Sequence, residues 1–400
     1  MPLYFGSLFW TNSLPEPARY PELGERRRAR AVIIGGGVSG VLCGYLLARS
    51  GIETDLIEQR RIASGSTAAN AGLLQFANDE MLSELAVKLG EEDAVRFYRA
   101  CRHAAERVND IAERLPRNVG FRRRSSLYYA SDSGDAAPLR REYEMLARHG
   151  FDADWWEADR IANNFPFRRS AAIVTRGDAE VNPYLFVHAL AEQAVRSGLH
   201  VYEQTKMLSV EPVGRRYIVQ TDRGAIEAEH VVYAVGYAPE AAGGRGAKAL
   251  LHRSYAIVTD PLPSLADWHE RFLLWETARP YLYLRTTEDN RVIVGGLDEN
   301  VRQPLLSKQE LRARSMKLLS GLRGLFPGYS PEIRYEWNAT FGESPDGLPW
   351  LGEDPDRPGL HYCLGYGGNG TIYSYLGAEM IRDRILGVPN PVARIVRPNR

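Results

Sequence analysis

Two glycine-rich segments contain the residues of this sequence best suited to chemistry. Residues 35–40, GGGVSG, have the spacing GxGxxG, and residues 365–370, GYGGNG, repeat that spacing near the other end of the 400-residue chain. Glycine allows a tight turn there and lets backbone N–H groups approach a phosphate closely. The spacing alone therefore predicts two loops that can bind an anionic group.

The elements around the first loop decide its chemistry. An apolar run at residues 31–34 precedes it, a helical pattern at residues 38–50 follows it, and a second apolar run covers residues 53–58. This strand–helix–strand order is the context in which GxGxxG indicates a dinucleotide site. Glu58 ends the second run, where a carboxylate can accept hydrogen bonds from both ribose hydroxyl groups. We therefore expect the dinucleotide at this loop.

The second loop has different surroundings. It also lies between a predicted strand, residues 360–364, and a predicted helix, residues 371–386. The acidic residue at the corresponding distance, Asp383, falls inside that helix rather than at a strand end. The second loop is therefore not expected to bind a dinucleotide. We expect its helix N-terminus to face developing negative charge, and a turn without a ligand is the alternative.

The composition excludes several other classes of function. Fifty Lys and Arg residues balance fifty Asp and Glu residues, so no net charge draws the chain to nucleic acid. Cys43, Cys101 and Cys363 form no CxxC pair, and the eight histidines show no HxxxH spacing, so neither a disulfide framework nor a metal site is expected. This cysteine usage fits the cytoplasm. Residues 31–48 carry no charge, but their five glycines favour a strand, a turn and a helix over a membrane span.

Helical and strand patterns alternate along the rest of the chain. Residues 78–115 indicate two helices with a break near Gly90, and Asn182 followed by Pro183 is a typical helix start. Further predicted strands cover residues 122–130, 200–203, 207–212, 216–221 and 225–235, and a predicted hairpin covers residues 281–294.

These patterns predict two interleaved domains. Strand–helix alternation near both ends of the chain favours a Rossmann-type α/β domain, and the middle favours an antiparallel sheet. We assign residues 1–80, 170–245 and 341–400 to the dinucleotide-binding domain and residues 81–169 and 246–340 to a substrate domain.

Four further segments narrow the assignment. They are residues 64–74, SGSTAANAGLL, residues 234–237, AVGY, residues 346–352, DGLPWLG, and residues 367–371, GGNGT. Together with the first loop they resemble the family of FAD-dependent amine and amino acid oxidoreductases, which includes D-amino acid oxidase, glycine oxidase and sarcosine oxidase. The resemblance extends over most of the chain.

This resemblance implies bound FAD and a reaction at a C–N bond. The family transfers a hydride from its substrate to flavin N5, the imine product hydrolyses, and O₂ or another acceptor reoxidises the flavin. The partners expected are thus a small amine or amino acid and an electron acceptor, with no nucleic acid. The residues expected to bind FAD are Gly35, Gly37, Val38, Ser39, Gly40, Glu58, Gln59, Arg60, Ser66, Thr67, Ala71, Gly72, Leu73, Leu208, Gly236, Gly367, Gly368, Asn369, Gly370 and Thr371.

One position departs from the family pattern. Where relatives have an Arg that clamps the substrate carboxylate, or a Cys that bonds to FAD, this sequence has Phe341. We therefore expect non-covalent FAD. The absence of the Arg leaves three classes of substrate open: secondary amines, N-substituted amino acids and polyamine-like compounds. Arg279, Tyr281 and Tyr283 alternate along a predicted strand and share one face. Arg279 is accordingly either a replacement clamp or a surface charge.

The candidate catalytic residues are Arg279, Tyr281, Tyr283 and Asn369. A protein of the same fold that binds FAD for assembly or chaperoning, without amine turnover, is the alternative function.

Overall fold

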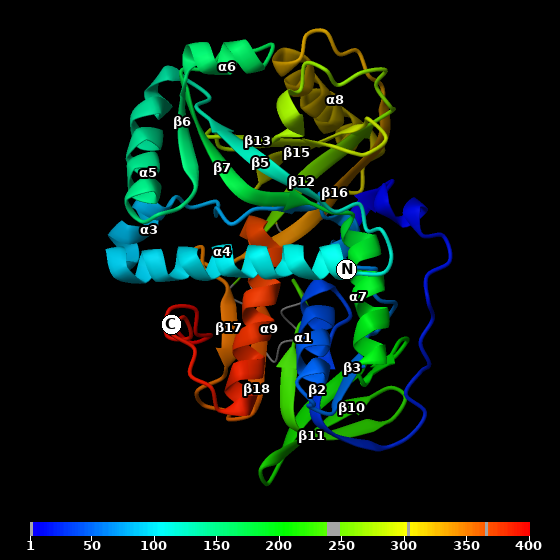
Figure 1. Ribbon diagram of the computed structural model, residues 1–400. Coiled ribbons are helices and arrows are strands. Elements are labelled where there is room, and N and C mark those ends of the chain that lie inside the picture. Colours follow the sequence, from blue (N-terminus) through cyan, green and yellow to red (C-terminus); the bar gives the residue numbers. More distant parts are fainter. Residues whose placement is uncertain (1–2, 238–248, 302–304, 365–366) are drawn as a thin grey trace.

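The computed structural model describes residues 3–237, 249–301, 305–364 and 367–400, which are organised around two sheets (Figure 1). A ten-stranded sheet lies at the top of Figure 1 and an eight-stranded sheet at the bottom. The long helix α4 (Glu91–Arg114) crosses between them. The fold is thus the expected combination of a Rossmann-type α/β part and an antiparallel part.

The eight-stranded sheet contains the predicted strand–helix–strand unit. Its order is β17-β18-β11-β2-β3-β8, and β2, β3, β8, β11 and β18 pair in parallel. An antiparallel ribbon of β10 and β9 extends from β11. The strands are β2 (Arg27–Ile34), β3 (Thr54–Ile57), β8 (Leu199–Tyr202), β9 (Met207–Val213), β10 (Arg216–Thr221), β11 (Ala225–Tyr233), β17 (Trp350–Glu353) and β18 (Leu360–Leu364).

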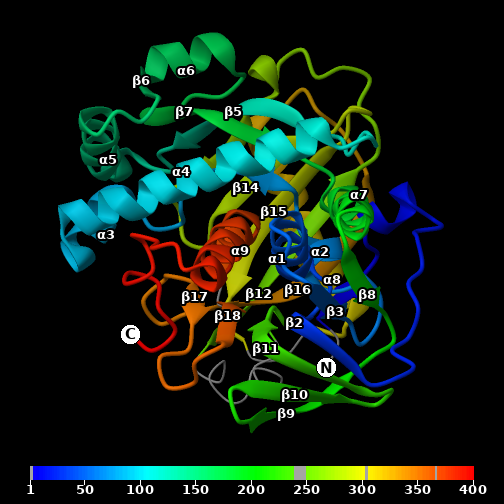
Figure 2. The same ribbon diagram turned by 60° about the horizontal axis from the view of Figure 1, so that its bottom comes forward.

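Three helices cover one face of this sheet (Figure 2). The middle one, α1 (Val38–Arg49), contacts both α7 (Pro183–Arg196) and α9 (Gly370–Leu386), and for that reason its residues 39–48 are all buried. The side chain of Asn182 accepts hydrogen bonds from the N–H groups of Tyr184 and Leu185, which confirms the predicted start of α7. The uncharged residues 31–48 are the end of β2, the turn and most of α1, as expected.

The ten-stranded sheet is mainly antiparallel, and in it only β13 and β5 pair in parallel among the described strands. Its order is β1-β16-β12-β15-β14-β13-β5-β7-β4, with β6 paired to β7. The strands are β1 (Tyr4–Gly6), β4 (Leu73–Leu74), β5 (Arg122–Tyr129), β6 (Ala153–Glu157), β7 (Ala171–Glu180), β12 (Leu250–Thr259), β13 (Leu273–Glu276), β14 (Leu282–Thr286), β15 (Val292–Glu299) and β16 (Ile333–Glu343).

Further helices surround this sheet. The predicted break at Gly90, which has a φ of 82°, separates α3 from α4. No described helix combines the length and the apolar character that crossing a bilayer requires. The remaining α-helices are α2 (Ser66–Ala69), α3 (Leu82–Leu89), α5 (Ala136–Arg148), α6 (Ala158–Asn164) and α8 (Lys308–Leu325).

The sheet pairing corrects one part of the expected domain boundary. The strand β7 falls within residues 170–245, which the sequence assigned to the dinucleotide-binding domain, yet it pairs with β5 and β6 in the ten-stranded sheet. Near the N-terminus, β1 pairs with β16 of the same sheet. Local patterns identify a strand but not its distant partner, and here the partner decides the domain. The rest of the division stays a prediction.

Candidate active site

The first glycine loop is shaped by close backbone contacts. Gly35 has a φ of 112°, which side chains rarely allow. A Cβ atom on Gly40 would lie 1.8 Å from the carbonyl oxygen of Gly35, so α1 can begin this close to β2 only because residue 40 is glycine. The helix therefore presents its N-terminal amides at the ends of the parallel strands β2 and β3.

Glu58 follows β3 beside this loop. Its carboxylate accepts hydrogen bonds from the N–H groups of Gly36 and Arg60, each at 2.8 Å. Burial raises the pKa of Glu58, and these two hydrogen bonds act against the increase. The carboxylate is thus held in one orientation at the wall of a cleft.

That cleft has a volume of about 670 Å³ and follows the first glycine loop. Leu208 also lines it and is 60% exposed, which is unusual for a leucine and leaves an apolar surface free to contact a ligand. The predicted FAD residues in its lining are Gly35, Gly37, Val38, Ser39, Glu58, Gln59, Arg60, Ser66, Thr67, Leu208, Gly236, Gly370 and Thr371. Their chemistry fits a dinucleotide, because free loop backbone, a carboxylate and an apolar surface occur along one cleft.

Gly40 and Gly72 lie outside the lining of both clefts among the described residues. A Cβ atom on Gly72 would lie 2.1 Å from the carbonyl oxygen of Val181. The structure therefore gives these two predicted FAD residues a packing role beside the site.

A second cavity of about 180 Å³ adjoins the cleft and shares five lining residues with it. Its walls come from residues 64–72, which we call the small-residue loop, from strands β12 to β16, from residues 367–369 of the second glycine loop and from the start of α9. Besides Ser66, Gly370 and Thr371, which also line the larger cleft, the predicted residues found here are Ala71, Leu73, Tyr281, Tyr283, Gly367, Gly368 and Asn369. The second glycine loop and the antiparallel sheet thus enclose one space at the end of the dinucleotide cleft.

Two residues that sequence reasoning missed hold the second glycine loop. Asp79 accepts a hydrogen bond from the N–H of Gly368 at 3.0 Å, and Asn78 accepts one from the side chain of Asn369 at 3.0 Å. The hydroxyl of Tyr373 also donates to Asn78, at 2.7 Å. Asp79 and Asn78 precede their partners Gly368 and Asn369 by 289 and 291 residues in the sequence. No local spacing therefore indicates this contact.

Comparison with known proteins identifies this arrangement. The family model described as "FAD dependent oxidoreductase" matches residues 30–384. The chain belongs to this family, and FAD is its cofactor. It is 27% identical to a glycine oxidase from Bacillus licheniformis, over 91% of this chain and 95% of that protein. It is 22% identical to the gamma-glutamylputrescine oxidoreductase of Escherichia coli, over 95% of this chain and 89% of that protein.

The fold agrees with solved structures of the family. The crystal structure of glycine oxidase from Geobacillus kaustophilus superimposes with a TM-score of 0.80 at 22% identity, over 94% of this chain and 99% of that one. The chain is therefore an FAD-dependent oxidoreductase with the fold of these enzymes. We call the larger space the FAD cleft and the smaller one the substrate cavity, after the roles that we propose for them.

Three side chains hold successive carbonyl groups of the small-residue loop of this flavoprotein. The indole N–H of Trp337 donates to the carbonyl of Ala69 at 3.0 Å, and that of Trp10 donates to the carbonyl of Asn70 at 2.7 Å. Arg285 donates to the next two carbonyl groups along the chain. Because these donors come from three distant segments, the loop beside the flavin site is fixed by tertiary contacts.

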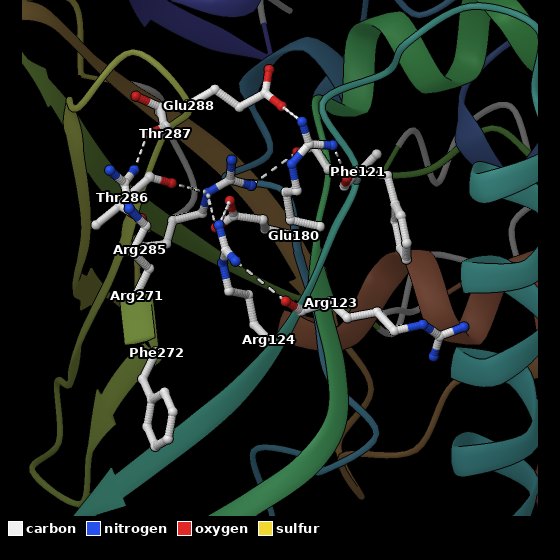
Figure 3. A network of polar contacts seen from close by, with 12 residues as sticks. Phe121, Arg123, Arg124, Glu180, Arg271, Phe272, Arg285, Thr286, Thr287 and Glu288 are labelled. Carbon is white, nitrogen blue, oxygen red and sulfur yellow. Dashed lines mark hydrogen bonds and ion pairs between the residues drawn. The ribbon is translucent and has the colours of Figure 1, made fainter. Parts of the chain in front are cut away.

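Arg285 itself belongs to a buried ionic network (Figure 3). Its side chain is 3% exposed, and its Nε lies 3.7 Å from Oε2 of Glu180, which is 1% exposed. Arg124 forms a shorter ion pair with the other oxygen of Glu180, at 2.9 Å. Two cations thus share one buried carboxylate, and burial lowers the pKa of Arg285.

Of the two alternatives for Arg279, the structure favours the surface charge over the replacement clamp. Arg279 is exposed, donates to the carbonyl groups of residues 276–278 and of Asp79, and lies 5.0 Å from the ring centroid of Tyr281. It is not part of the described lining of the substrate cavity, whereas Tyr281 and Tyr283 are. The predicted common face therefore holds for the two tyrosines only, because the donors of Arg279 are engaged by backbone carbonyls.

Phe341 lies in the wall of the substrate cavity, on β16. Two acidic residues that the sequence did not single out also lie there, Asp79 and Asp298. Burial raises the pKa of Asp298 to about 6, and a hydrogen bond from Ser254 acts against this increase. Within the described part of the chain, no Lys, Arg or His lines this cavity, and no group of three metal-ligating side chains occurs in the molecule.

Proposed function

We propose that this flavoprotein oxidises a C–N bond of a small amine or amino acid. In this reaction the C–H bond next to nitrogen breaks, a hydride leaves, and the nitrogen lone pair forms a C=N bond. Water then adds to the carbon, the C–N bond breaks, and a carbonyl compound and an amine are released. Bound FAD supplies the hydride acceptor and passes the two electrons to O₂ or another acceptor.

The observation that carries this proposal is the substrate cavity at the end of the FAD cleft. Its walls combine the second glycine loop with side chains of the antiparallel sheet. Trp275, Tyr281 and Phe341 provide large apolar surfaces that exclude water from the reacting carbon. A small uncharged amine placed there is held close to the flavin site, and this proximity is the main contribution that the protein makes to hydride transfer.

Polar atoms in the same walls are suited to orienting a substrate. The indole Nε1 of Trp275 and the hydroxyl of Thr340 are buried, and neither has a hydrogen-bond partner in the described chain. Buried polar atoms are normally satisfied, so a ligand that supplies their partners fits this cavity. A nearby carboxylate, Asp79, can take up the proton that the substrate nitrogen releases.

Anaerobic reduction of the holoprotein tests this function. Purified protein with bound FAD is mixed without oxygen with alkylamines, diamines, N-methyl amino acids and D-amino acids, and loss of the oxidised flavin absorbance is followed. Free FAD under the same light is the control. Reduction by at least one class supports the proposal, and the response to added oxygen separates an oxidase from a dehydrogenase. Absence of reduction across the panel contradicts it and favours the FAD-binding protein without turnover.

A further inference from the structure

One carboxylate in the wall of the substrate cavity has an oxygen that accepts no hydrogen bond from the described chain. Asp79 is paired, because its two oxygens accept hydrogen bonds from the hydroxyl of Tyr281 at 3.2 Å and from the N–H of Gly368 at 3.0 Å. Asp298, at the end of β15, is different. Its Oδ1 is buried and has no hydrogen-bond partner in the described chain. A buried carboxylate oxygen without a donor is costly, so a donor supplied by a ligand would stabilise it.

The other walls are suited to a cation. The aromatic residues Trp275, Tyr281, Tyr283 and Phe341 surround the cavity together with Asp298. Aromatic faces attract an ammonium ion, and the attraction is larger where water is excluded. Thr340 is 7% exposed, and its buried hydroxyl has no partner in the described chain, so its oxygen can accept a hydrogen bond from an ammonium group. Trp275 is also 7% exposed, and its unpaired indole N–H can only donate, so it fits the lone pair of an uncharged nitrogen rather than a cation.

The charges around the cavity also disfavour an anion. Glu343, at the end of β16, has a pKa raised to about 7, first by burial and then by the negative charges of Asp79, Asp298 and Glu80. The cations nearby are already engaged: Lys88 pairs with Glu80 at 2.6 Å, and Arg279 donates to backbone carbonyl groups. A substrate carboxylate beside Asp298 would be repelled and would find no cation among the described lining residues.

We propose that the substrate is a small amine that carries a second, cationic nitrogen and no carboxylate, and that Asp298 binds this second nitrogen. This inference rests on the function proposed above. The reacting nitrogen must be uncharged when its neighbouring C–H bond breaks, because its lone pair forms the C=N bond. A lasting ionic contact with Asp298 therefore requires a nitrogen other than the reacting one. Diamines have this chemistry, and amino acids do not.

An equilibrium binding experiment tests the proposed contact between Asp298 and a cationic nitrogen without turnover. Holoprotein is titrated at constant ionic strength with tert-butylammonium or with acetate, while the flavin absorbance is recorded. tert-Butylammonium offers N–H donors but has no C–H bond on the carbon next to nitrogen, so it cannot be oxidised to an imine. We expect a saturable spectral change with tert-butylammonium and none with acetate. Asp298→Asn is expected to weaken tert-butylammonium binding about tenfold or more, because the negative charge of the contact is removed. Asp159→Asn, a substitution of an 83% exposed acid on α6, is the matched control and is expected to change nothing.

A substrate panel then separates this inference from the proposed function. Diaminobutane, butylamine and N-methylglycine are compared as anaerobic reductants of wild-type holoprotein. We expect diaminobutane to be fastest, with an advantage over butylamine that Asp298→Asn removes mainly through KM. If N-methylglycine or butylamine reduces the flavin as well as the diamine, the inference is wrong and the proposed function stands. If none of the three reduces it while tert-butylammonium still binds through Asp298, the proposed function fails and the cation site stands. Saturable acetate binding with no tert-butylammonium binding overturns the inference even if Asp298→Asn does not fold.

Discussion

Nη1 of Arg285 lies 2.7 Å from the carbonyl oxygen of Gly72 and donates a hydrogen bond to it. The same atom also donates to the carbonyl groups of Val181, at 2.9 Å, and Ala71, at 3.3 Å. Arg285 is part of β14 in the antiparallel sheet, whereas Gly72 ends the small-residue loop beside the flavin site. One guanidinium group thus joins the sheet that forms the substrate cavity to the loop that borders both spaces.

Arg285→Met is expected to destabilise the protein strongly and to weaken FAD retention. It removes the hydrogen bonds to the loop and leaves the buried Glu180 with one cation fewer, a type of change that costs about 3–5 kcal/mol. The free energy of unfolding from urea titration and the FAD content after gel filtration measure the two effects. Arg122→Met, at a half-exposed ion pair with Glu288, is the control and is expected to cost less than about 1 kcal/mol. Equal losses in both variants would contradict the role of Arg285.

Gly40→Ala is expected to abolish FAD binding. The added methyl group would overlap the carbonyl oxygen of Gly35, and because both groups belong to the backbone, the start of α1 must move. Flavin absorbance of the purified protein measures the loss. Gly324→Ala in α8 is the control, since nothing lies within 4 Å of its added Cβ atom, and helix propensity there favours Ala by roughly 0.5–1 kcal/mol. Normal flavin content in Gly40→Ala would show that the loop has room that the structure does not give it.

FAD is expected to dissociate on acid precipitation. Phe341 has no nucleophilic atom, and Cys43, Cys101 and Cys363 are all buried. Burial also raises the pKa of Cys101 to about 12, which leaves almost no thiolate to react at neutral pH. Precipitation with trichloroacetic acid should therefore leave a colourless pellet and a yellow supernatant. Yellow colour that stays with the washed pellet would demonstrate a covalent bond.

Arg279→Ala is expected to leave the KM for an amine substrate unchanged. The guanidinium of Arg279 is engaged by backbone carbonyl groups and stacks on Tyr281 outside the described cavity lining. Steady-state kinetics of the variant beside Asp298→Asn compare the two residues directly. A large increase in KM for Arg279→Ala, together with an unchanged KM for Asp298→Asn, would restore Arg279 as the substrate clamp.

The stability of the protein is expected to fall below about pH 6.5, in part because of His188. Its side chain is 1% exposed, and burial lowers its pKa from 6.5 to about 4. Above pH 6.5 the residue is neutral in both states. Between about pH 6.5 and 4 the unfolded state binds a proton that the folded state does not, which costs up to about 3 kcal/mol. Urea unfolding at pH 7.5 and 5 should show a smaller loss for His188→Phe than for wild type, and an equal loss would contradict this assignment.

The sequence by itself determined the parts of this flavoprotein that depend on near neighbours. The first glycine loop, the strand–helix–strand unit and Glu58 follow one another within a short segment, where spacing reports geometry directly. The Asn182 cap and the break at Gly90 were also predictable, because each depends on the conformation of one or two residues.

Only the tertiary structure decided what the substrate cavity contains. Asp79, Trp275 and Asp298 come from three separate segments and converge because their strands and loops pair across the ten-stranded sheet and with the second glycine loop. Arg279 fails as a cavity residue for the same reason, since its carbonyl partners are set by the folded chain and not by strand alternation. Spacing fixes which residues share a local element, whereas the charge of a cavity depends on long-range pairing that spacing does not encode.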